Sequence, residues 1–219
     1  MWSLALIRKE FWQTLPIQII GLGLMLLYVL SLCGFQMLNL NVAYPTDIPF
    51  FNDITAFSIP ILGGFLAAIL GFWQTLSESY RGTWLFLWHR PVTRMKVTTV
   101  KLLTGLGILW GILVLPMLVY AWWASIPGNV PAPMLWENTA MYWKSCFGLS
   151  MIYLSSFLCG LRQARWYGSR LLPLLVAVFA AFMLLSTEYL STATLVLIVL
   201  IDCLFLAAIH YQLTHEDFS

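Results

Sequence analysis

Residues 102–136 read LLTGLGILWGILVLPMLVYAWWASIPGNVPAPMLW, and no charged side chain interrupts them. A helix needs about 20 mostly apolar residues to cross a membrane, because the hydrocarbon core is about 30 Å thick and a helix rises about 1.5 Å per residue. The stretch satisfies this length before it reaches the turn-forming residues Pro127-Gly128-Asn129. It therefore predicts a membrane-spanning helix over residues 98–123.

Similar uncharged or nearly uncharged stretches recur along the rest of the chain. Together they predict an all-α, polytopic integral membrane protein, a single transmembrane domain over residues 1–219. The last two predicted spans are separated by only a short segment around Glu188, so a buried hairpin that does not fully cross is an alternative for them. The six spans are expected near residues 15–38, 54–76, 98–123, 138–160, 171–186 and 191–211.

The composition agrees with this class. Of the 219 residues, 61% are hydrophobic and 9% are charged, whereas about 25% of an ordinary soluble domain is charged. This excludes a soluble enzyme, a disordered linker and a disulfide-stabilised secreted domain. A net charge of +2 is too small to indicate a nucleic-acid partner. The solvent expected for this chain is the lipid bilayer.

The basic residues predict the orientation of the spans. If the spans alternate in direction, ten of the 11 Lys and Arg residues fall on one side, and Lys144 is the exception. Positive charge is retained in the cytoplasm, so both termini are expected there, in a multi-pass protein of the cell membrane such as the bacterial inner membrane. The ten residues are Arg8, Lys9, Arg81, Arg90, Arg94, Lys96, Lys101, Arg162, Arg165 and Arg170.

The N-terminal segment has the pattern of an amphipathic helix. Placed on a helix, Leu4, Ile7, Phe11 and Trp12 share one face, and polar residues that include Glu10 share the other. This favours an interfacial helix over residues 1–14, lying along the inner membrane surface. The alternative is that the segment extends the first span.

The loop over residues 77–96, between the second and third spans, combines charge with tryptophan and leucine. It predicts a short amphipathic helix held against the membrane, able to transmit a push from a soluble partner to the spans on either side. An ordinary basic loop is the alternative. The residues that stand out in it are Glu78, Arg81, Gly82, Thr83, Pro91 and Arg94.

These residues, followed by Lys101, resemble the "E…GT…L…PVSR…K" pattern of type-2 ATP-binding-cassette (ABC) transporter permeases, and LIRKEFWQTL near the N-terminus resembles that family's opening helix. The resemblance implies that the loop docks on a separate ATPase subunit and that two permease subunits, identical or different, enclose a transport path for export. The chain has no G-x-x-x-x-G-K-[ST] motif. ATP and magnesium would therefore bind in the partner, and the chain would not itself be an enzyme. A non-transporting membrane scaffold or accessory subunit is the alternative.

Two ionisable residues lie at membrane depth in the predicted spans: Lys144 in the fourth and Asp202 near the middle of the sixth. Because ions there are costly, we expect either a salt bridge between them or separate positions on a transport path. Asp202 bonded to nearby hydroxyl groups is the alternative. Gly107 and Gly111 form a G-x-x-x-G pattern that permits close helix packing, within the subunit or across a dimer.

A distant third function is a rhomboid-like intramembrane protease, because Gly148-Leu149-Ser150 and His210 resemble its Gly-x-Ser-Gly serine and its histidine. Met151 stands where the second glycine is required. The expected depths of Ser150 and His210 also differ by about 10 Å, so no catalytic residue is predicted. The cysteines and histidines lack metal-ligand spacing, and no metal site is expected.

Overall fold

The computed structural model describes residues 2–33, 48–50, 53–80, 93–130, 132–162, 166–186 and 191–215. Every regular element in these residues is helical, which confirms the predicted all-α class. Six of the helices are long and apolar enough to cross a membrane. The elements are α1 (Trp2–Leu32), α2 (Asp53–Tyr80), α4 (Arg94–Ala124), the short 3₁₀ helix η1 (Trp136–Thr139), α5 (Ala140–Leu161), α6 (Tyr167–Leu185) and α7 (Thr192–His215).

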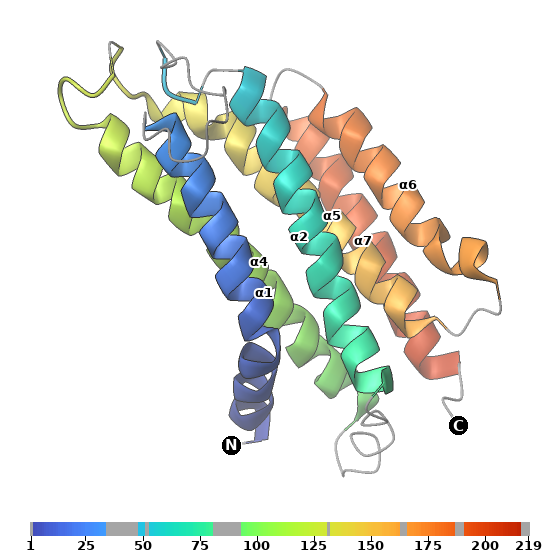
Figure 1. The fold of residues 1–219 in the computed structure, drawn as a ribbon. Helices are drawn as coiled ribbons and strands as arrows, with labels where there is room; N and C mark the ends of the chain where they lie inside the picture. The colour runs from blue at the N-terminus through green and yellow to red at the C-terminus, as the bar shows by residue number, and fades with distance from the viewer. Residues whose placement is uncertain are drawn as a thin grey trace.

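The six long helices form a bundle in which successive helices run in opposite directions (Figure 1). As a result, α1 begins and α7 ends at the same end of the bundle, which we call the terminal end. The end of α2 and the beginning of α4 lie there too. Both α6 and α7 have the length and apolar composition of complete spans, which favours two crossings over the hairpin alternative.

Helix α5 occupies the centre of the bundle and packs against α2, α6 and α7. In the apolar stretch of the candidate span that contains α5, 94% of the residues are buried. The corresponding share is 17% in α6 and 22% in α7. Small residues allow the closest approach: a Cβ at Gly71 of α2 would overlap the Ser156 hydroxyl, and one at Gly160 of α5 would overlap Thr75. Helices in lipid associate through such close packing, because hydrocarbon tails already solvate large apolar side chains.

The G-x-x-x-G pattern of α4 does not make a contact of this kind within the described part of the chain. A Cβ added at Gly107 or at Gly111 would meet no atom within 4 Å. The described residues therefore provide no close helix contact at either glycine inside the subunit. Packing of the two glycines across a dimer stays a prediction.

The N-terminal segment also differs from the expectation of a separate helix over residues 1–14. Helix α1 is continuous for 31 residues and includes Pro16. The apolar side chains Leu4 and Trp12 point outward, while Glu10 and Thr14 are fully buried. The polar face of this segment therefore turns toward the bundle, where other helices supply charged partners.

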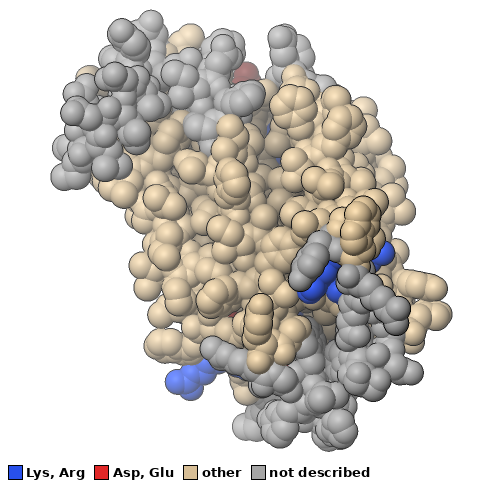
Figure 2. Space-filling model, turned by 45° about the vertical axis from the view of Figure 1, so that its right-hand side comes forward, with Lys and Arg blue, Asp and Glu red and all other residues tan. Residues whose placement is uncertain are grey.

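The charged residues gather toward the ends of the bundle. Most of the face drawn in Figure 2 consists of residues other than Lys, Arg, Asp and Glu. Basic side chains come to its surface at the lower left and on the right just below mid-height, and an acidic one near the top. This agrees with the predicted segregation of Lys and Arg, and Lys144 in α5 remains the exception. The basic residues described at helix ends of the terminal side are Arg8, Lys9, Arg94, Lys96, Lys101, Arg162 and Arg170.

Candidate functional site

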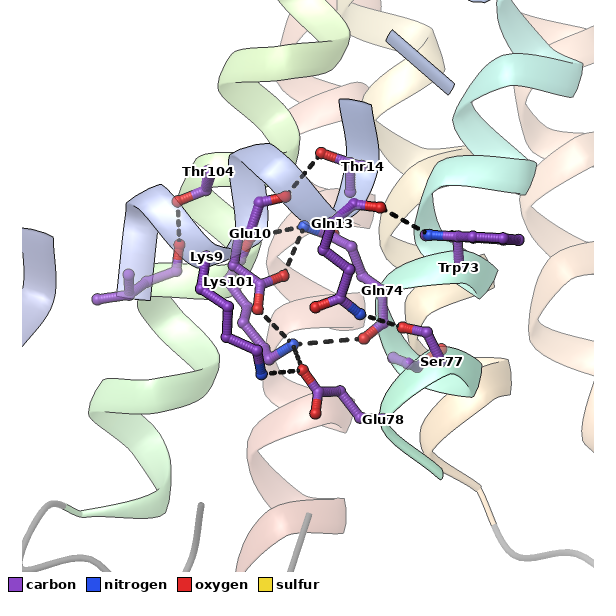
Figure 3. A network of polar contacts seen from close by, with 12 residues as sticks. Lys9, Glu10, Gln13, Thr14, Trp73, Gln74, Ser77, Glu78, Lys101 and Thr104 are labelled. Atoms are coloured by element: carbon purple, nitrogen blue, oxygen red, sulfur yellow. Dashed lines mark hydrogen bonds and ion pairs between the residues drawn. The ribbon is translucent and has the colours of Figure 1, made fainter. Parts of the chain in front are cut away.

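The most strongly organised polar site is a cluster of four charged side chains near the terminal end, which we call the charge cluster: Lys9, Glu10, Glu78 and Lys101 (Figure 3). Lys101 Nζ lies 2.7 Å from Glu10 Oε1 and 3.0 Å from Glu78 Oε1. The side chain of Lys101 is 0% exposed. Lys9 Nζ lies 2.5 Å from the same Glu78 oxygen, and its side chain is 40% exposed. The cluster thus joins α1, α2 and α4.

The charges of the cluster balance, with two ammonium groups and two carboxylates. Burying an ion costs several kcal/mol unless a partner of opposite charge and hydrogen bonds compensate for the lost water. An ammonium group has three hydrogens to donate. In Lys101 they face Glu10, Glu78 and the backbone carbonyl of Gln74, which is 3.4 Å away. Two carboxylates and one carbonyl thus surround the buried ammonium group.

Neutral side chains extend the cluster to α5. The Tyr153 hydroxyl donates to Gln74 Oε1 at 2.6 Å, and Gln74 Nε2 donates to Glu10 Oε2 and to the Lys101 carbonyl, both at 3.4 Å. Gly105 of α4 makes room for this chain of bonds: a Cβ there would overlap the Tyr153 hydroxyl and lie 2.5 Å from Gln74 Oε1. The polar network therefore connects four helices.

Two further bonds fix α1 to α2 on the outer side of the cluster (Figure 3). Trp73 Nε1 donates to the Gln13 carbonyl at 3.0 Å, and the Gln13 amide donates to the Ser77 hydroxyl. Both bonds lie beside Glu10 and Glu78 along the helices, so they join the same stretches of α1 and α2 as the cluster does.

The position of the cluster relates it to the predicted coupling residues. Glu78 lies two residues before the end of α2, and Arg94 is the exposed first residue of α4. Lys101 follows Arg94 by about 10 Å along the helix. The cluster therefore lies at the base of both helices that flank residues 81–92. Four of the predicted residues, Arg81, Gly82, Thr83 and Pro91, lie outside the described residues.

The ion pairs of the cluster join helices α1, α2 and α4 to one another. Each charged group in it is held by a group of opposite charge, and within the described residues no set of three His, Cys, Asp or Glu side chains could hold a metal ion. The arrangement is suited to keeping helix ends in register.

The two predicted intramembrane ions are placed apart from this cluster. Asp202 Oδ2 lies 2.6 Å from the hydroxyl of Ser150, as in the alternative that bonds it to a neighbouring hydroxyl. Lys144 is buried in α5, six residues before Ser150 and about 9 Å from it along the axis. The salt bridges of the described residues do not include one between Lys144 and Asp202.

The serine and histidine considered for a protease have different neighbours. Ser150 contacts Asp202, whereas His210 Nδ1 lies 3.1 Å from Met95 Sδ. Met95 is the second residue of α4, so this contact is at the terminal end.

Sequence reasoning singled out Glu78 and Lys101 but did not predict that they meet Glu10. It placed Glu10 on a solvent face, and it did not single out Gln74, Gly105 or Tyr153. A usable signal was present in the spacing of four residues, which puts Gln74 with Glu78 and Lys101 with Gly105 on single helix faces. Which faces meet, however, depends on the packing of helices far apart in the chain.

Comparisons with protein-family models, with curated proteins and with solved structures find no match to this chain.

Proposed function

We propose that the chain is the permease subunit of an ABC transporter, coupled to a separate ATPase subunit through residues 77–96. One observation carries this proposal: the charge cluster fastens α2 and α4, the two helices that flank residues 81–92, to each other and to α1. The resemblance of Glu78, Arg94 and Lys101 to the permease pattern supports it from the sequence.

The cluster supports a mechanism for the transmission of movement. A force applied to the loop would act on α2 and α4 at their ends. Because Lys101 is bonded to Glu10 and Glu78 within one turn or two of those ends, the three helices would move together instead of bending locally. The close contact between α2 and α5 at Gly71 and Gly160 would then carry the movement into the bundle.

The remaining components follow from the same proposal. ATP and magnesium would bind to the partner ATPase, and a second permease subunit, identical or different, would complete the membrane path. Transport would be export, as the resemblance implies. This chain would form one side of the membrane path, and its helices would move when the partner hydrolyses ATP. It would have no catalytic residue of its own.

Site-specific photo-crosslinking tests the partner. A photoreactive amino acid replaces Trp84 in the loop, and a matched control carries it at Val130, which belongs to the opposite end of the bundle. After irradiation in native membranes, we expect the Trp84 variant to be joined to a protein that contains a Walker A motif, identified by mass spectrometry. The Val130 variant should not be joined to it.

ATP hydrolysis by the purified complex in liposomes tests the coupling. We expect Arg81→Ala to lower it at least tenfold, and Glu78→Gln to do the same where the variant folds, whereas Glu137→Gln, an exposed carboxylate at the opposite end, should leave it unchanged. Crosslinking without an ATP-binding partner, or hydrolysis unaffected by Arg81→Ala, would favour the non-transporting scaffold.

A further inference from the structure

A second polar contact lies deep in the bundle, between α5 and α7. Asp202 is near the middle of α7, and its Oδ2 atom is 2.6 Å from Ser150 Oγ. The same Ser150 oxygen is 2.5 Å from the backbone carbonyl oxygen of Phe147, one turn earlier in α5. Three oxygen atoms therefore form a chain with two short contacts.

The number of hydrogens decides how this chain can be bonded. A serine hydroxyl has one hydrogen to donate, and a backbone carbonyl and an ionised carboxylate can only accept. With Asp202 ionised, the single hydrogen of Ser150 is either shared between two acceptors or leaves one of the two short oxygen contacts without a hydrogen. With Asp202 protonated, its Oδ2–H donates to Ser150, and Ser150 donates to Phe147. Both short contacts are then explained.

The surroundings also disfavour an ionised carboxylate. The second oxygen, Asp202 Oδ1, is buried and has no hydrogen-bond partner among the residues that the structure describes. The buried residues one turn away on either side, Ile198 and Phe205, are apolar. A charge at this depth in a membrane is costly unless a partner or water compensates for it. A neutral acid avoids that cost.

No cation compensates for Asp202 in the part of the chain that the structure describes. Its hydrogen-bond partner among these residues is Ser150, and no ion pair joins it to a helix packed against α7. Lys101 of α4 belongs to the charge cluster. The ionisable residues of the packed helices α4 and α5 are Arg94, Lys96, Lys101, Tyr120, Tyr142, Lys144, Cys146, Tyr153 and Cys159.

We infer that Asp202 is a proton-binding site within the membrane, held as a neutral carboxylic acid that donates a hydrogen bond to Ser150. The site is distinct from the charge cluster, in which every carboxylate contacts an ammonium group. The inference does not depend on the proposed transport function.

Infrared spectroscopy of the full chain in liposomes tests this inference. At neutral pH we expect a carbonyl-stretching band of a protonated carboxylic acid, absent from Asp202→Asn and shifted in Ser150→Ala. Glu137→Gln, which changes an exposed carboxylate, should keep the band. A wild-type spectrum identical to that of Asp202→Asn in this region would overturn the inference.

A chemical probe covers the case in which Asp202→Asn does not fold. An apolar carbodiimide adds to protonated carboxyl groups inside membranes, and mass spectrometry locates the adduct on the wild-type chain. We expect modification of Asp202 at neutral pH and none of Glu137. Modification of Glu137 but not Asp202 would show that Asp202 is ionised and would overturn the inference.

Discussion

Lys101 is the residue on which the charge cluster depends. Its ammonium group is the shared partner of two buried carboxylates from different helices, so its removal would leave like charges facing each other in a dry environment. Lys9 contacts Glu78 but is partly exposed, and its ion pair is correspondingly weaker in the presence of water. Most of the stabilisation that the cluster provides is therefore expected to come from Lys101.

We predict that Lys101→Met lowers the free energy of unfolding by about 3–5 kcal/mol, because it leaves buried charge without compensation. Thermal unfolding in detergent measures the effect. Lys96→Met, which removes an exposed lysine from the same helix, is the matched control and should leave stability unchanged. Equal stability of the two variants would contradict the buried ion pairs.

At the scale of the helices, two glycines of α4 have opposite surroundings: one is closely packed against other helices and the other is exposed. Gly105 faces Tyr153 and Gln74, whereas Gly107, two residues later, faces open space. Nothing in the local sequence distinguishes the two positions, since both lie in the same apolar run. Their difference arises only from the way in which α4 is rotated toward α2 and α5.

We predict opposite effects for alanine at these two positions. Gly105→Ala should destabilise the bundle by about 1–3 kcal/mol, because its Cβ forces Tyr153 and Gln74 apart. Gly107→Ala should be neutral or slightly stabilising, because alanine favours the helix by up to about 1 kcal/mol. Unfolding in detergent gives both values, and a destabilising Gly107→Ala would indicate that this face is covered.

The positions of the helices were largely predictable from the sequence, and the site was not. An apolar run such as residues 102–123 forms a helix in lipid because the bilayer offers no other hydrogen-bond partner for its backbone. The burial of Glu10 could not be inferred in this way, since its partners Lys101 and Gln74 are remote in the chain. Asp202 was predicted as intramembrane, but its contact with Ser150 depends on the packing of α7 on α5.

At the scale of the whole molecule, the bundle has two chemically different ends. The described basic residues apart from Lys144 belong to the helix ends on the terminal side. From this asymmetry the positive-inside rule predicts an orientation with the terminal end in the cytoplasm. Gly128 and Thr214 are described residues at opposite ends of the bundle and suit a direct test.

We predict that a membrane-impermeant maleimide labels a cysteine at position 128 in intact cells and one at position 214 only after the membrane is opened. Each cysteine is introduced into a chain from which Cys33, Cys146, Cys159 and Cys203 have been removed. The cysteine-free parent is the control for background labelling. The reverse pattern would place the basic end outside the cell.

The charge cluster also sets an order for biosynthesis. Glu10 and Glu78 are translated, and enter the membrane with α1 and α2, before the ribosome reaches Lys101. The contacts of Lys101 with both carboxylates can form only after α4 has been translated, so the charge cluster is completed by the third of the long helices.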